Sequence, residues 1–501
     1  MDSATDNWGL QPMQGAVGPG LGQAFGEYAG PLWIEQLERE RTRQRLCNLV
    51  IIIYYLLILE GALRKWIAPS YQRPLFFIRD PFVIWIYVIA LSKGFWPRLT
   101  FLFWCGLALS MLALGSIVVH AGSVPLVIMA YGWRNYFAYL PLAFIIGEEF
   151  TAREWSRIVK FTFLIAAPMA LLCVIQSVSS VTSPINAGFG NTSDDMFLTL
   201  GVAGHIMRAS GTFSSTAGLT EYVGSLFALI LWVLMGRGTQ PRVNAKLAFA
   251  TLAAVTILIT CGSRGAFVLV LVLLVGATAL LIMQHRVRRA LSLWAAGIVL
   301  VGLTILGGLM FVRQSSALIE RSRGAAQEDS WYSFGLLNRA LSDFSHFVVF
   351  MPQVGLLGNG LGLGGNAANI EKFQGTLPEA EDDWSRNIVD LGPVLGLFYI
   401  IFRIAFVAWL VWGAARASRL YDDPLPVLLI SFIGIIMLYG QITGQGSINC
   451  YTWLFAGFCM AANHGRLTEF EPETPGANGA YGAMPGARGT LWSLQYAVRE
   501  K

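Results

Sequence analysis

Charged residues are scarce in this sequence. Only 13% of the 501 residues are Asp, Glu, Lys or Arg, whereas 55% are hydrophobic. A soluble protein of this length carries about 25% charged residues, so the deficit argues against a soluble globular chain. The net charge of +5 is modest, and the basic residues occur in short loops. No nucleic-acid partner is therefore expected.

Several other signals are also missing. The six cysteines are isolated, each lies within or beside an apolar segment, and no CxxC pair occurs. Buried free thiols are therefore expected instead of disulfides. The histidines are scattered and no spacing is typical of a metal site, so no metal ion or cofactor is expected. Residues 1–45 are Gly-rich and then charged, without an apolar h-region, so no signal peptide is expected.

Long apolar segments without alternation dominate the rest of the chain. In hydrocarbon every backbone polar group must be satisfied within its own segment or within a closed barrel, and non-alternating segments favour helices. We expect an all-α polytopic membrane protein with about twelve transmembrane helices. The predicted spans are Cys47–Trp66, Leu75–Leu91, Leu99–Val119, Val124–Ile146, Ile158–Val178, Tyr222–Met235, Ala245–Thr260, Ala266–Met283, Leu291–Val312, Ile388–Ala415, Leu425–Ile442 and Tyr451–Asn463.

The distribution of basic residues predicts the orientation. If the N-terminus is cytoplasmic, every second loop is basic, as the positive-inside rule requires. Both termini are then cytoplasmic, and two long loops, 179–221 and 313–387, lie outside, the second between the ninth and tenth spans. Residues 1–45 form an N-terminal tail, disordered up to Gly30 and then a surface or solvated helix. Residues 46–464 form the transmembrane domain, and residues 465–501 form a disordered tail.

Some arginines are not explained by this orientation. They lie on the predicted outer side or within apolar segments, where a cation costs a few kcal/mol at depth. An anion is expected to offset that cost. These residues are Arg64, Arg79, Arg134, Arg208, Arg264, Arg339 and Arg386.

Two motifs combine such an arginine with a helix start. Thr260–Ala266 joins two apolar segments, and its glycines allow a tight turn that places Arg264 at the beginning of the next helix. Arg208–Thr216 precedes another helix and contains hydroxyls and a glycine. The alternative for Thr260–Ala266 is a plain turn with a snorkelling arginine. The alternative for Arg208–Thr216 is a polar loop with an N-capping Ser or Thr. Together they favour a shared anion such as phosphate or pyrophosphate.

Two further arginines have possible acidic partners. Glu60 and Arg64 form an i,i+4 pair, and Arg79 with Asp80 is able to join it, so a structural ion-pair network is expected there. Arg134 is surrounded by apolar sequence, where an arginine is a functional-site candidate by default. Pairing of Arg134 with Glu60 or Asp80 is the competing explanation.

The second outer loop is the longest polar interval. Its Gly358–Gly365 segment is not a nucleotide motif, because no strand–turn–helix unit surrounds it. A tight connection with close backbone approach is expected instead. Glu379, Glu381, Asp382 and Asp383 precede a helix start, where a solvated acidic cluster favoured by the helix dipole is the simplest interpretation.

These elements, in this order, resemble the O-antigen ligase and Wzy-type O-antigen polymerase superfamily. The resemblance rests on Ser263–Ala266 after an apolar run, on Arg208–Phe213, and on a large outer loop with a Gly-x-Gly element. It rests also on the spacing from Glu381 to Leu391–Leu397, a Leu-Gly-x-x-x-Gly-Leu segment that enters a helix. Ligases of this superfamily typically have a histidine where this chain has Glu381, and glutamate is more typical of polymerases.

The resemblance implies a polymerase of lipid-linked polysaccharide repeat units (O-antigen, capsule or exopolysaccharide) in the bacterial inner membrane. The site would face the periplasm and carry out a metal-independent, inverting glycosyl transfer from an undecaprenyl-pyrophosphate-linked glycan. Glu381 would be the general base, with Asp382 and Asp383 as bystanders, and Arg264 and Arg208 would hold the pyrophosphate. The substrate-binding candidates of second rank are Arg134, Arg64, Arg339 and Arg386.

Other functions remain open at this point. A ligase of the same superfamily would transfer a finished glycan once. A lipid-linked oligosaccharide flippase would place its cations in a cavity accessible from both faces, and a non-catalytic assembly subunit is a further alternative. The expected partners are the undecaprenyl-pyrophosphate-linked oligosaccharide, membrane lipids and, as a candidate, a chain-length-regulating polysaccharide co-polymerase.

Overall fold

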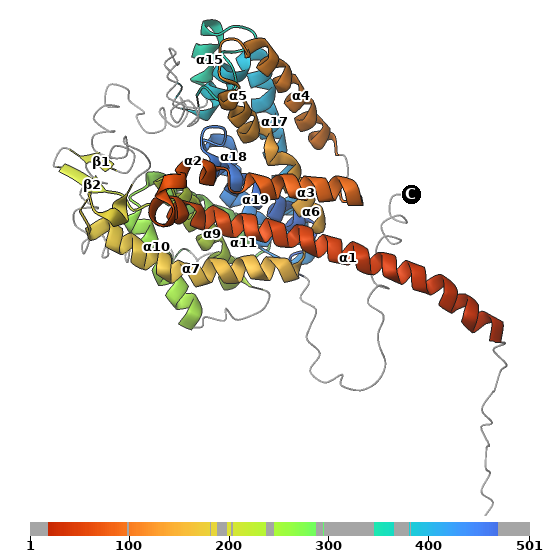
Figure 1. Ribbon diagram of the computed structural model, residues 1–501. Helices are drawn as coiled ribbons and strands as arrows, with labels where there is room; N and C mark the ends of the chain where they lie inside the picture. The colour runs from red at the N-terminus through yellow and green to blue at the C-terminus, as the bar shows by residue number, and fades with distance from the viewer. Residues whose placement is uncertain are drawn as a thin grey trace, which may run out of the picture. The chain divides into compact units, whose positions relative to one another are not determined.

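The computed structural model describes a predominantly helical chain (Figure 1). A single short antiparallel hairpin is present in the described part, formed by β1 (Leu198–Gly201) and β2 (Gly204–Met207) with Leu198 paired to Met207. The described residues are 19–97, 100–180, 182–187, 198–201, 204–236, 245–286, 294, 345–364, 380 and 382–468.

The helices follow the predicted apolar segments closely. The longer ones are α1 (Pro19–Ala62), α3 (Asp80–Lys93), α4 (Phe101–His120), α6 (Leu140–Glu149), α7 (Ala152–Val178), α9 (Thr216–Met235), α10 (Ala245–Thr260), α11 (Arg264–Met283), α17 (Asp383–Tyr421), α18 (Leu425–Tyr439) and α19 (Gly446–Asn463). The short ones include α2 (Gln72–Phe76), α5 (Leu126–Trp133) and α15 (Phe347–Phe350). The predicted ninth span, Leu291–Val312, lies outside the described residues except for residue 294.

Membrane-spanning helices are present in the described residues. Six are long and apolar enough to cross a bilayer, namely Ile34–Ile67, Phe101–His120, Ala152–Val178, Thr216–Met235, Arg264–Met283 and Asp383–Tyr421. Two shorter apolar helices are Ala245–Thr260 and Leu425–Tyr439. Large apolar side chains such as Trp85, Phe101 and Leu271 are exposed on the helix surfaces, as expected for contact with lipid. The total of about twelve spans stays a prediction.

The N-terminal segment expected to be disordered is helical in its second part. α1 is continuous from Pro19 to Ala62, so the segment expected to be disordered up to Gly30 is helical from Pro19. Residues 35–45 are rich in Glu, Gln and Arg, which are good helix formers. Arg43 pairs with Glu40 at 2.8 Å within α1 and with Glu154 of α7 at 3.1 Å, and these contacts support the helix beyond its apolar part.

Two predicted spans contain a turn of π-helix. α1 passes into a π-helical turn at Leu63–Ile67, and the predicted span 124–146 is divided into α5, a π-helical turn at Arg134–Ala138 and α6. Arg64 lies in the first π turn and Arg134 begins the second. π turns widen a helix and are frequent at functional sites, so Arg64 and Arg134 are both in places that favour a functional role.

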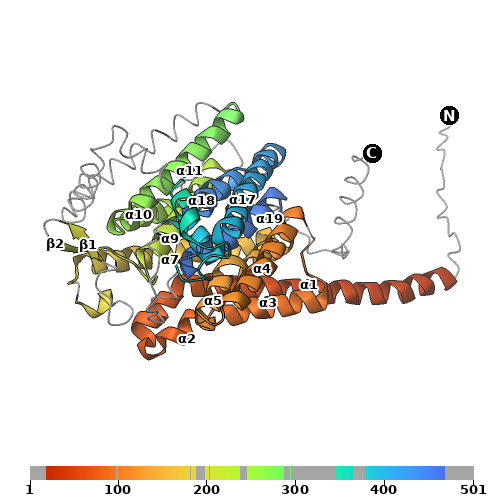
Figure 2. The ribbon, with the colours of Figure 1, turned by 90° about the horizontal axis from the view of Figure 1, so that it is seen from above.

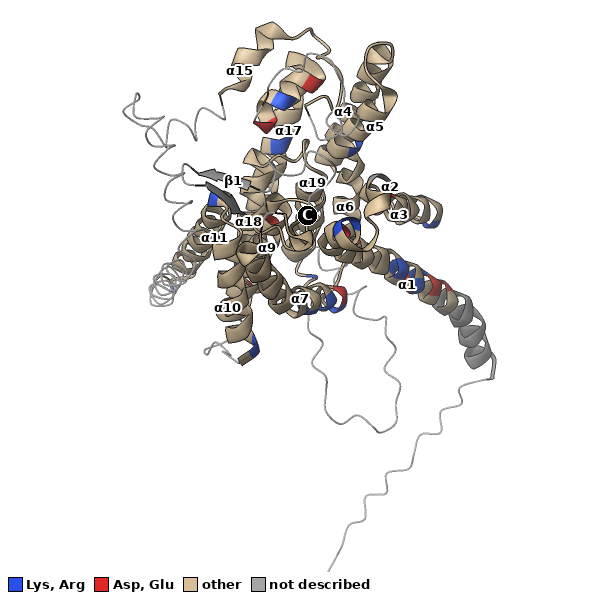
Figure 3. Cartoon of the chain, turned by 60° about the vertical axis from the view of Figure 1, so that its left-hand side comes forward, with Lys and Arg blue, Asp and Glu red and all other residues tan. Residues whose placement is uncertain are grey.

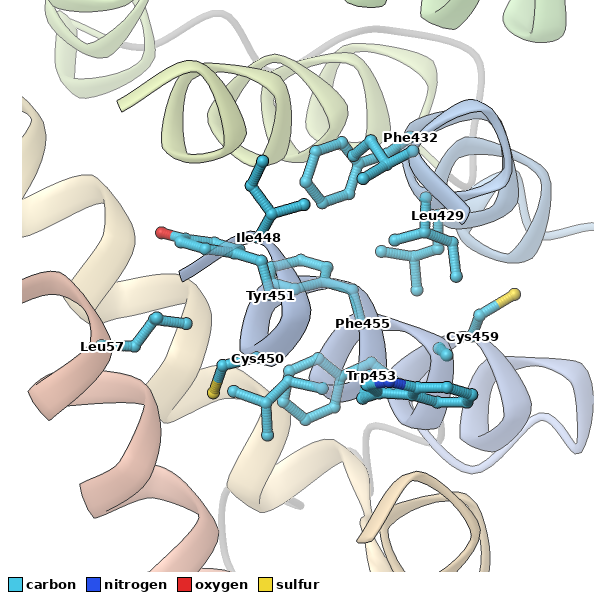
Figure 4. Packing of buried hydrophobic residues seen from close by; sticks show 14 of the residues in the cluster. Leu57, Leu429, Phe432, Ile448, Cys450, Tyr451, Trp453, Phe455 and Cys459 are labelled. Atoms are coloured by element: carbon cyan, nitrogen blue, oxygen red, sulfur yellow. The ribbon is translucent and has the colours of Figure 1, made fainter. Parts of the chain in front are cut away.

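α19 lies at the centre of the helix packing, against α6, α17 and α18 (Figure 4). Tyr451, Trp453 and Phe455 are fully buried there. A Cβ atom added to Gly457 would meet Ile146 at 2.7 Å, which shows the close approach of helices that small residues permit in membranes. Seen from above, α10 and α11 lie beside α9 (Figure 2). The cysteines are free, as predicted, and all but Cys105 are buried.

Several helix ends contact one another. Ends that the sequence places outside contact one another, through Trp66 Nε1 and the Pro184 carbonyl at 3.1 Å and through Lys65 and Ser210 at 2.7 Å. Ends that it places in the cytoplasm do so too, through Trp232 and Asp423 at 3.2 Å. We refer to the first set as the Lys65 end of the helices. Which compartment this end faces stays a prediction.

Candidate functional site

Glu60 of α1 holds two arginines at the Lys65 end. Its carboxylate lies 3.1 Å from Nη1 of Arg64 and 2.8 Å from Nε of Arg79. Arg79 is only 1% exposed, and its Nη1 donates to the Gly446 carbonyl at 3.4 Å. The predicted ion-pair network is therefore confirmed for Glu60, Arg64 and Arg79.

Asp80 pairs with Arg134 instead of with its neighbour Arg79. Nε of Arg134 lies 2.7 Å from Oδ2 of Asp80, and the Tyr139 hydroxyl donates to the other carboxylate oxygen at 3.2 Å. The predicted alternative of an ion pair with Asp80 is confirmed. The guanidinium of Arg134 also lies 5.5–5.8 Å from four aromatic rings, which partly offset its desolvation. These rings belong to Phe76, Phe77, Tyr131 and Tyr139.

Both ion pairs converge on the first residue of α19. A Cβ atom added to Gly446 would lie 3.3 Å from Nη1 of Arg134, 3.8 Å from Nη2 of Arg79 and 3.7 Å from the Tyr131 hydroxyl. The preceding residue, Gln445, makes no side-chain cap to the helix. Two guanidinium groups thus lie beside a helix N-terminus, where the partial charge of the helix is also positive.

We call Glu60, Arg64, Arg79, Asp80, Tyr131 and Arg134 the α19 cluster. It contains three cations and two carboxylates, so its formal charge is +1. Each of the three arginines is buried, where a charge is costly unless it is paired.

A second set of cations lies on the other side of the last turn of α1. Nζ of Lys65 donates to the Ser210 hydroxyl at 2.7 Å, and Nε of Arg208 donates to the Cys261 carbonyl at 3.5 Å. The Ala209 N–H bonds the Thr260 carbonyl at 3.3 Å. The Arg208–Phe213 and Thr260–Ala266 motifs therefore lie side by side, and we call this pair of segments the Arg208 turn.

Arg264 occupies the predicted position within the Arg208 turn. It is the first residue of α11, with Ser263 as N-cap and Gly262 at φ 55°. Its side chain is exposed, so a guanidinium and free helix N–H groups are both accessible there. α9 begins at Thr216, the last residue of the second motif. This start precedes the expected span, Tyr222–Met235, so Glu221 lies within the helix, where it is buried.

Gln176 and Gly61 fix the backbone of the Arg208 turn. Oε1 of Gln176 accepts from the N–H groups of Ser210 at 3.2 Å and Gly211 at 2.8 Å. Gly61 of α1 lies so close to the Thr212 and Phe213 backbone that a Cβ atom would overlap it. Gly61 therefore allows the end of α1 to pack directly against the Arg208 turn.

Asp383 is not solvated, unlike the acidic cluster that the sequence predicted. It is 2% exposed, and its Oδ2 lies 2.5 Å from Nη1 of Arg403, which is completely buried. Arg386 lies 3.4 Å from Oδ1, and the Thr443 hydroxyl donates to the same oxygen at 2.8 Å. The predicted solvated cluster is wrong at this position because α17 is kinked at Gly392. The kink brings Arg403, which lies 20 residues further along α17, into contact with Asp383. Asp382 is the N-cap of α17 and accepts from Ser385 N–H at 2.8 Å.

The Gly-rich segment packs its backbone against α5 and α17, as predicted. A Cβ atom on Gly358 would meet the Asp390 carbonyl at 2.6 Å, and Gly362 contacts Gly132 of α5. The buried Asp390 carboxylate accepts from the N–H groups of Gly362 and Gly364 and from the Tyr136 hydroxyl, each at 3.2 Å. Acidic and basic residues alternate along the first turns of α17 (Figure 3).

Two predicted site residues are not placed. Glu381 and Arg339 lie outside the described residues, as do 313–344 and 365–379 of the second outer loop. Of the other candidates, Arg64 and Arg134 belong to the α19 cluster, and Arg208 and Arg264 belong to the Arg208 turn. Arg386 lies against Gly444, just before α19.

The sequence did not point to Tyr131 as a member of the α19 cluster, nor to Asp390 and Arg403 as buried partners of other polar groups. Each is separated from its contacts by long stretches of chain, so only proximity in the fold gives it a role. The signal available was a polar residue inside an apolar span, which is costly unless it is partnered. Among the described residues, no group of His, Cys, Asp and Glu is arranged to hold a metal ion.

The fold and the site define a helical, multi-pass membrane protein with arginine clusters buried at one end of its helices. No protein-family model matches the chain, and no curated protein matches it at a significant level.

Proposed function

We propose that this protein is a polymerase of lipid-linked polysaccharide repeat units. The observation that carries the proposal is the gathering of cations at the Lys65 end of the helices. Arg64 and Arg134, in the two π turns, and Arg79, just before α3, are buried there. Arg208 and the exposed Arg264 belong to the neighbouring Arg208 turn. A dianionic pyrophosphate on a polyprenyl chain is the kind of ligand that offsets such charge next to a membrane.

The proposed reaction transfers a growing glycan from its lipid carrier. A hydroxyl oxygen of the acceptor repeat unit attacks the anomeric carbon of the donor, and the bond from that carbon to the pyrophosphate oxygen breaks with inversion. Glu381 takes the hydroxyl proton. Arg208 and Arg264 stabilise the charge that builds on the departing undecaprenyl pyrophosphate, with Arg64, Arg134, Arg339 and Arg386 as residues that bind the substrates.

Two observations favour polymerase over the alternatives. Glutamate at position 381, where related ligases typically have histidine, favours a polymerase over a ligase. The described cation clusters gather at one end of the helices, whereas a flippase requires a cation path that both faces reach. The proposed site accordingly faces the periplasm from the bacterial inner membrane, where a chain-length-regulating co-polymerase is a candidate partner.

The test is polymerisation with purified components. The full chain in nanodiscs, supplied with lipid-linked repeat units, is expected to give a ladder of products and to release one undecaprenyl pyrophosphate for each new bond. A single transfer without a ladder would identify a ligase. Movement of the lipid-linked substrate across proteoliposomes without any covalent extension would identify a flippase, and either result would overturn the proposal.

A further inference from the structure

One carboxyl group in a membrane-spanning helix has no partner. Glu221 of α9 is 5% exposed and lies within the candidate span Thr216–Met235. Its Oε2 atom is buried, and no hydrogen bond or ion pair joins this carboxyl group to any described residue. An unpaired carboxylate is very costly in apolar surroundings, and an ionisable residue within a span is a functional-site candidate.

Glu221 differs in this respect from the other buried carboxyl groups. Each of the others in the described part of the chain accepts from an arginine, a backbone N–H or a tryptophan N–H. These residues are Glu60, Glu154, Asp383, Asp390 and Asp423. The missing partner of Glu221 is therefore a property of its own position and not a general feature of the protein.

The helices that pack on α9 supply no counter-charge to Glu221. α18 and α19 contain no Asp, Glu, Lys or Arg. α10 has only Lys246, which lies at the end remote from the Arg208 turn, and the charged residues of α7 precede Phe161 at the same remote end. Arg264 at the start of α11 is exposed. Arg208, in the segment before α9, bonds the Cys261 carbonyl.

The titratable groups that surround this part of α9 are phenols and thiols. Tyr451 of α19 lies within electrostatic range of Glu221 (Figure 4), and its buried hydroxyl makes no hydrogen bond with a described residue. Phe213 of the Arg208 turn joins the two helices, because its ring lies 6.1 Å from that of Tyr222 and 6.2 Å from that of Tyr451. None of these groups is a cation. The remaining titratable neighbours are Tyr54 of α1 and Cys173 of α7.

A proton is the ligand that fits this place. The buried Oε2 atom of Glu221 and the buried hydroxyl of Tyr451 leave no room for a hydrated ion, whereas a proton needs no space. Protonation removes the charge, so the neutral acid is the stable form in these surroundings. We propose that Glu221 is an intramembrane proton-binding site that holds its proton at neutral pH, with the Tyr451 hydroxyl as the adjacent polar group.

Release of this proton would act on the Arg208 turn. The O–H bond of the carboxyl group breaks, the proton passes to water, and the bonding electrons stay on the carboxylate. A charge without a counter-ion is then buried between α9 and α19, which weakens their packing. α9 begins at the last residue of the Arg208–Thr216 motif, and Phe213 of that motif packs on Tyr451. The turn therefore loosens together with the start of α9.

Infrared difference spectroscopy of the full chain in an ester-free detergent tests the protonation state. A protonated carboxyl group has a carbonyl stretching band that a carboxylate lacks. At neutral pH, Glu221→Gln is expected to remove one such acid band from the spectrum of the unchanged protein. Glu38→Gln, at an exposed position of α1, is the matched control and should remove carboxylate bands instead. Loss of carboxylate bands in Glu221→Gln would overturn the site.

A pH titration tests the coupling to the Arg208 turn. As the pH is raised, the unchanged protein should lose the acid band, and its unfolding temperature should fall below that of Glu221→Gln, which cannot ionise. Hydrogen exchange at residues 208–216 should be faster in the unchanged protein than in this variant at the same alkaline pH. Equal unfolding temperatures and exchange rates at every pH would overturn the coupling. Glu221→Leu, an apolar residue of similar size, replaces Glu221→Gln if the latter does not fold.

Tyr451→Phe tests the second member of the site while Glu221 stays in place. The substitution removes a hydroxyl that is able to donate to the carboxylate after the proton has left, so the acid band should persist to a higher pH than in the unchanged protein. Loss of the band at the same pH would exclude the Tyr451 hydroxyl from the site. None of these outcomes depends on the proposed polymerase function, because each follows from the burial of Glu221 alone.

Discussion

Two groups of buried arginines flank the connection between α18 and α19, and they differ in how their charge is balanced. The α17 group, which consists of Asp383, Arg386, Asp390 and Arg403, has two cations and two carboxylates. The α19 cluster has three cations and two carboxylates. The first group lies within α17, whereas the second joins the π turns of Arg64 and Arg134 to Asp80 at the start of α3.

Hydrogen bonds add to the ion pairs in both groups. Asp383 receives hydrogen bonds from the Thr443 hydroxyl and N–H in addition to its ion pairs, and Arg403 donates to the Met437 carbonyl at 2.7 Å. In the α19 cluster Arg79 donates to the Gly446 carbonyl at 3.4 Å, and the Tyr139 hydroxyl donates to Asp80 at 3.2 Å. Buried charges are stabilised when ion pairs and hydrogen bonds act together.

Removing a carboxylate from the balanced group is expected to have the largest effect. Asp383→Ala leaves Arg403 buried without a counter-charge, and breaking a buried pair in this way costs about 3–5 kcal/mol of stability. Thermal unfolding of the purified protein in detergent measures the loss. Asp382→Ala is the matched control, because it removes a helix cap worth about 1 kcal/mol and a long contact of 3.9 Å to the exposed His346, but no partner of a buried arginine. Equal losses in the two variants would mean that the α17 group does not hold the fold.

The adjacent carboxylate is expected to affect catalysis and not the fold. Glu381→Gln keeps the size of the side chain but removes the proposed base, so polymer formation should fall about a hundredfold to ten-thousandfold. The rate of ladder formation measures this effect, and an unchanged unfolding temperature shows that the fold is intact. Full activity of this variant would exclude Glu381 as the base.

The kink of α17 is expected to have a smaller effect. Gly392 has φ 83° and ψ 168° inside the helix, and a Cβ atom added there would meet the backbone N of Gly358, in the Gly-rich segment, at 2.6 Å. Gly392→Ala should destabilise the protein by about 1–3 kcal/mol through the strained backbone alone, and more if the loop is displaced. Gly434→Ala serves as the control, because its Cβ atom would lie at 3.6 Å or more from its neighbours, and an alanine in an α-helix interior without a clash is stabilising. If the two variants unfold at the same temperature, the docking of the loop on α17 is not as described.

The smallest expected effect concerns the exposed arginine of the Arg208 turn. Arg264→Ala removes an exposed guanidinium that forms no ion pair with a carboxylate of the described residues. Stability should therefore be unchanged within about 0.5 kcal/mol. Binding of undecaprenyl pyrophosphate should weaken about tenfold, as expected for loss of one charge-assisted contact. Titration of the lipid against Arg264→Ala and Arg264→Lys measures this, and unchanged affinity in the alanine variant would argue against an anion at this turn.

Local patterns in the sequence were sufficient for part of the site. The turn at Thr260–Ala266, the position of Arg264 at the start of α11 and the Glu60–Arg64 pair each depend on residues only a few positions apart. All three are confirmed. The close packing of Gly358–Gly364 also followed from the sequence, because glycine permits a backbone approach that other residues block. These features are determined by local chemistry and do not require knowledge of the fold.

The partners of the charged residues were decided only by the tertiary structure. Arg134 had two candidate partners in the sequence and forms its ion pair with Asp80. Asp383 forms an ion pair with Arg403. The π turns that carry Arg64 and Arg134 were likewise not apparent from hydropathy, which measures composition and not the register of hydrogen bonds.

The sequence by itself determined that the chain is a helical membrane protein with surplus arginines, because hydropathy and charge are properties of composition and spacing. Only the tertiary structure decided which of these arginines are neutralised and which are not. That decision depends on contacts between segments as distant as residues 79 and 446. In an apolar environment, such contacts determine whether a buried cation stabilises the fold or requires a ligand.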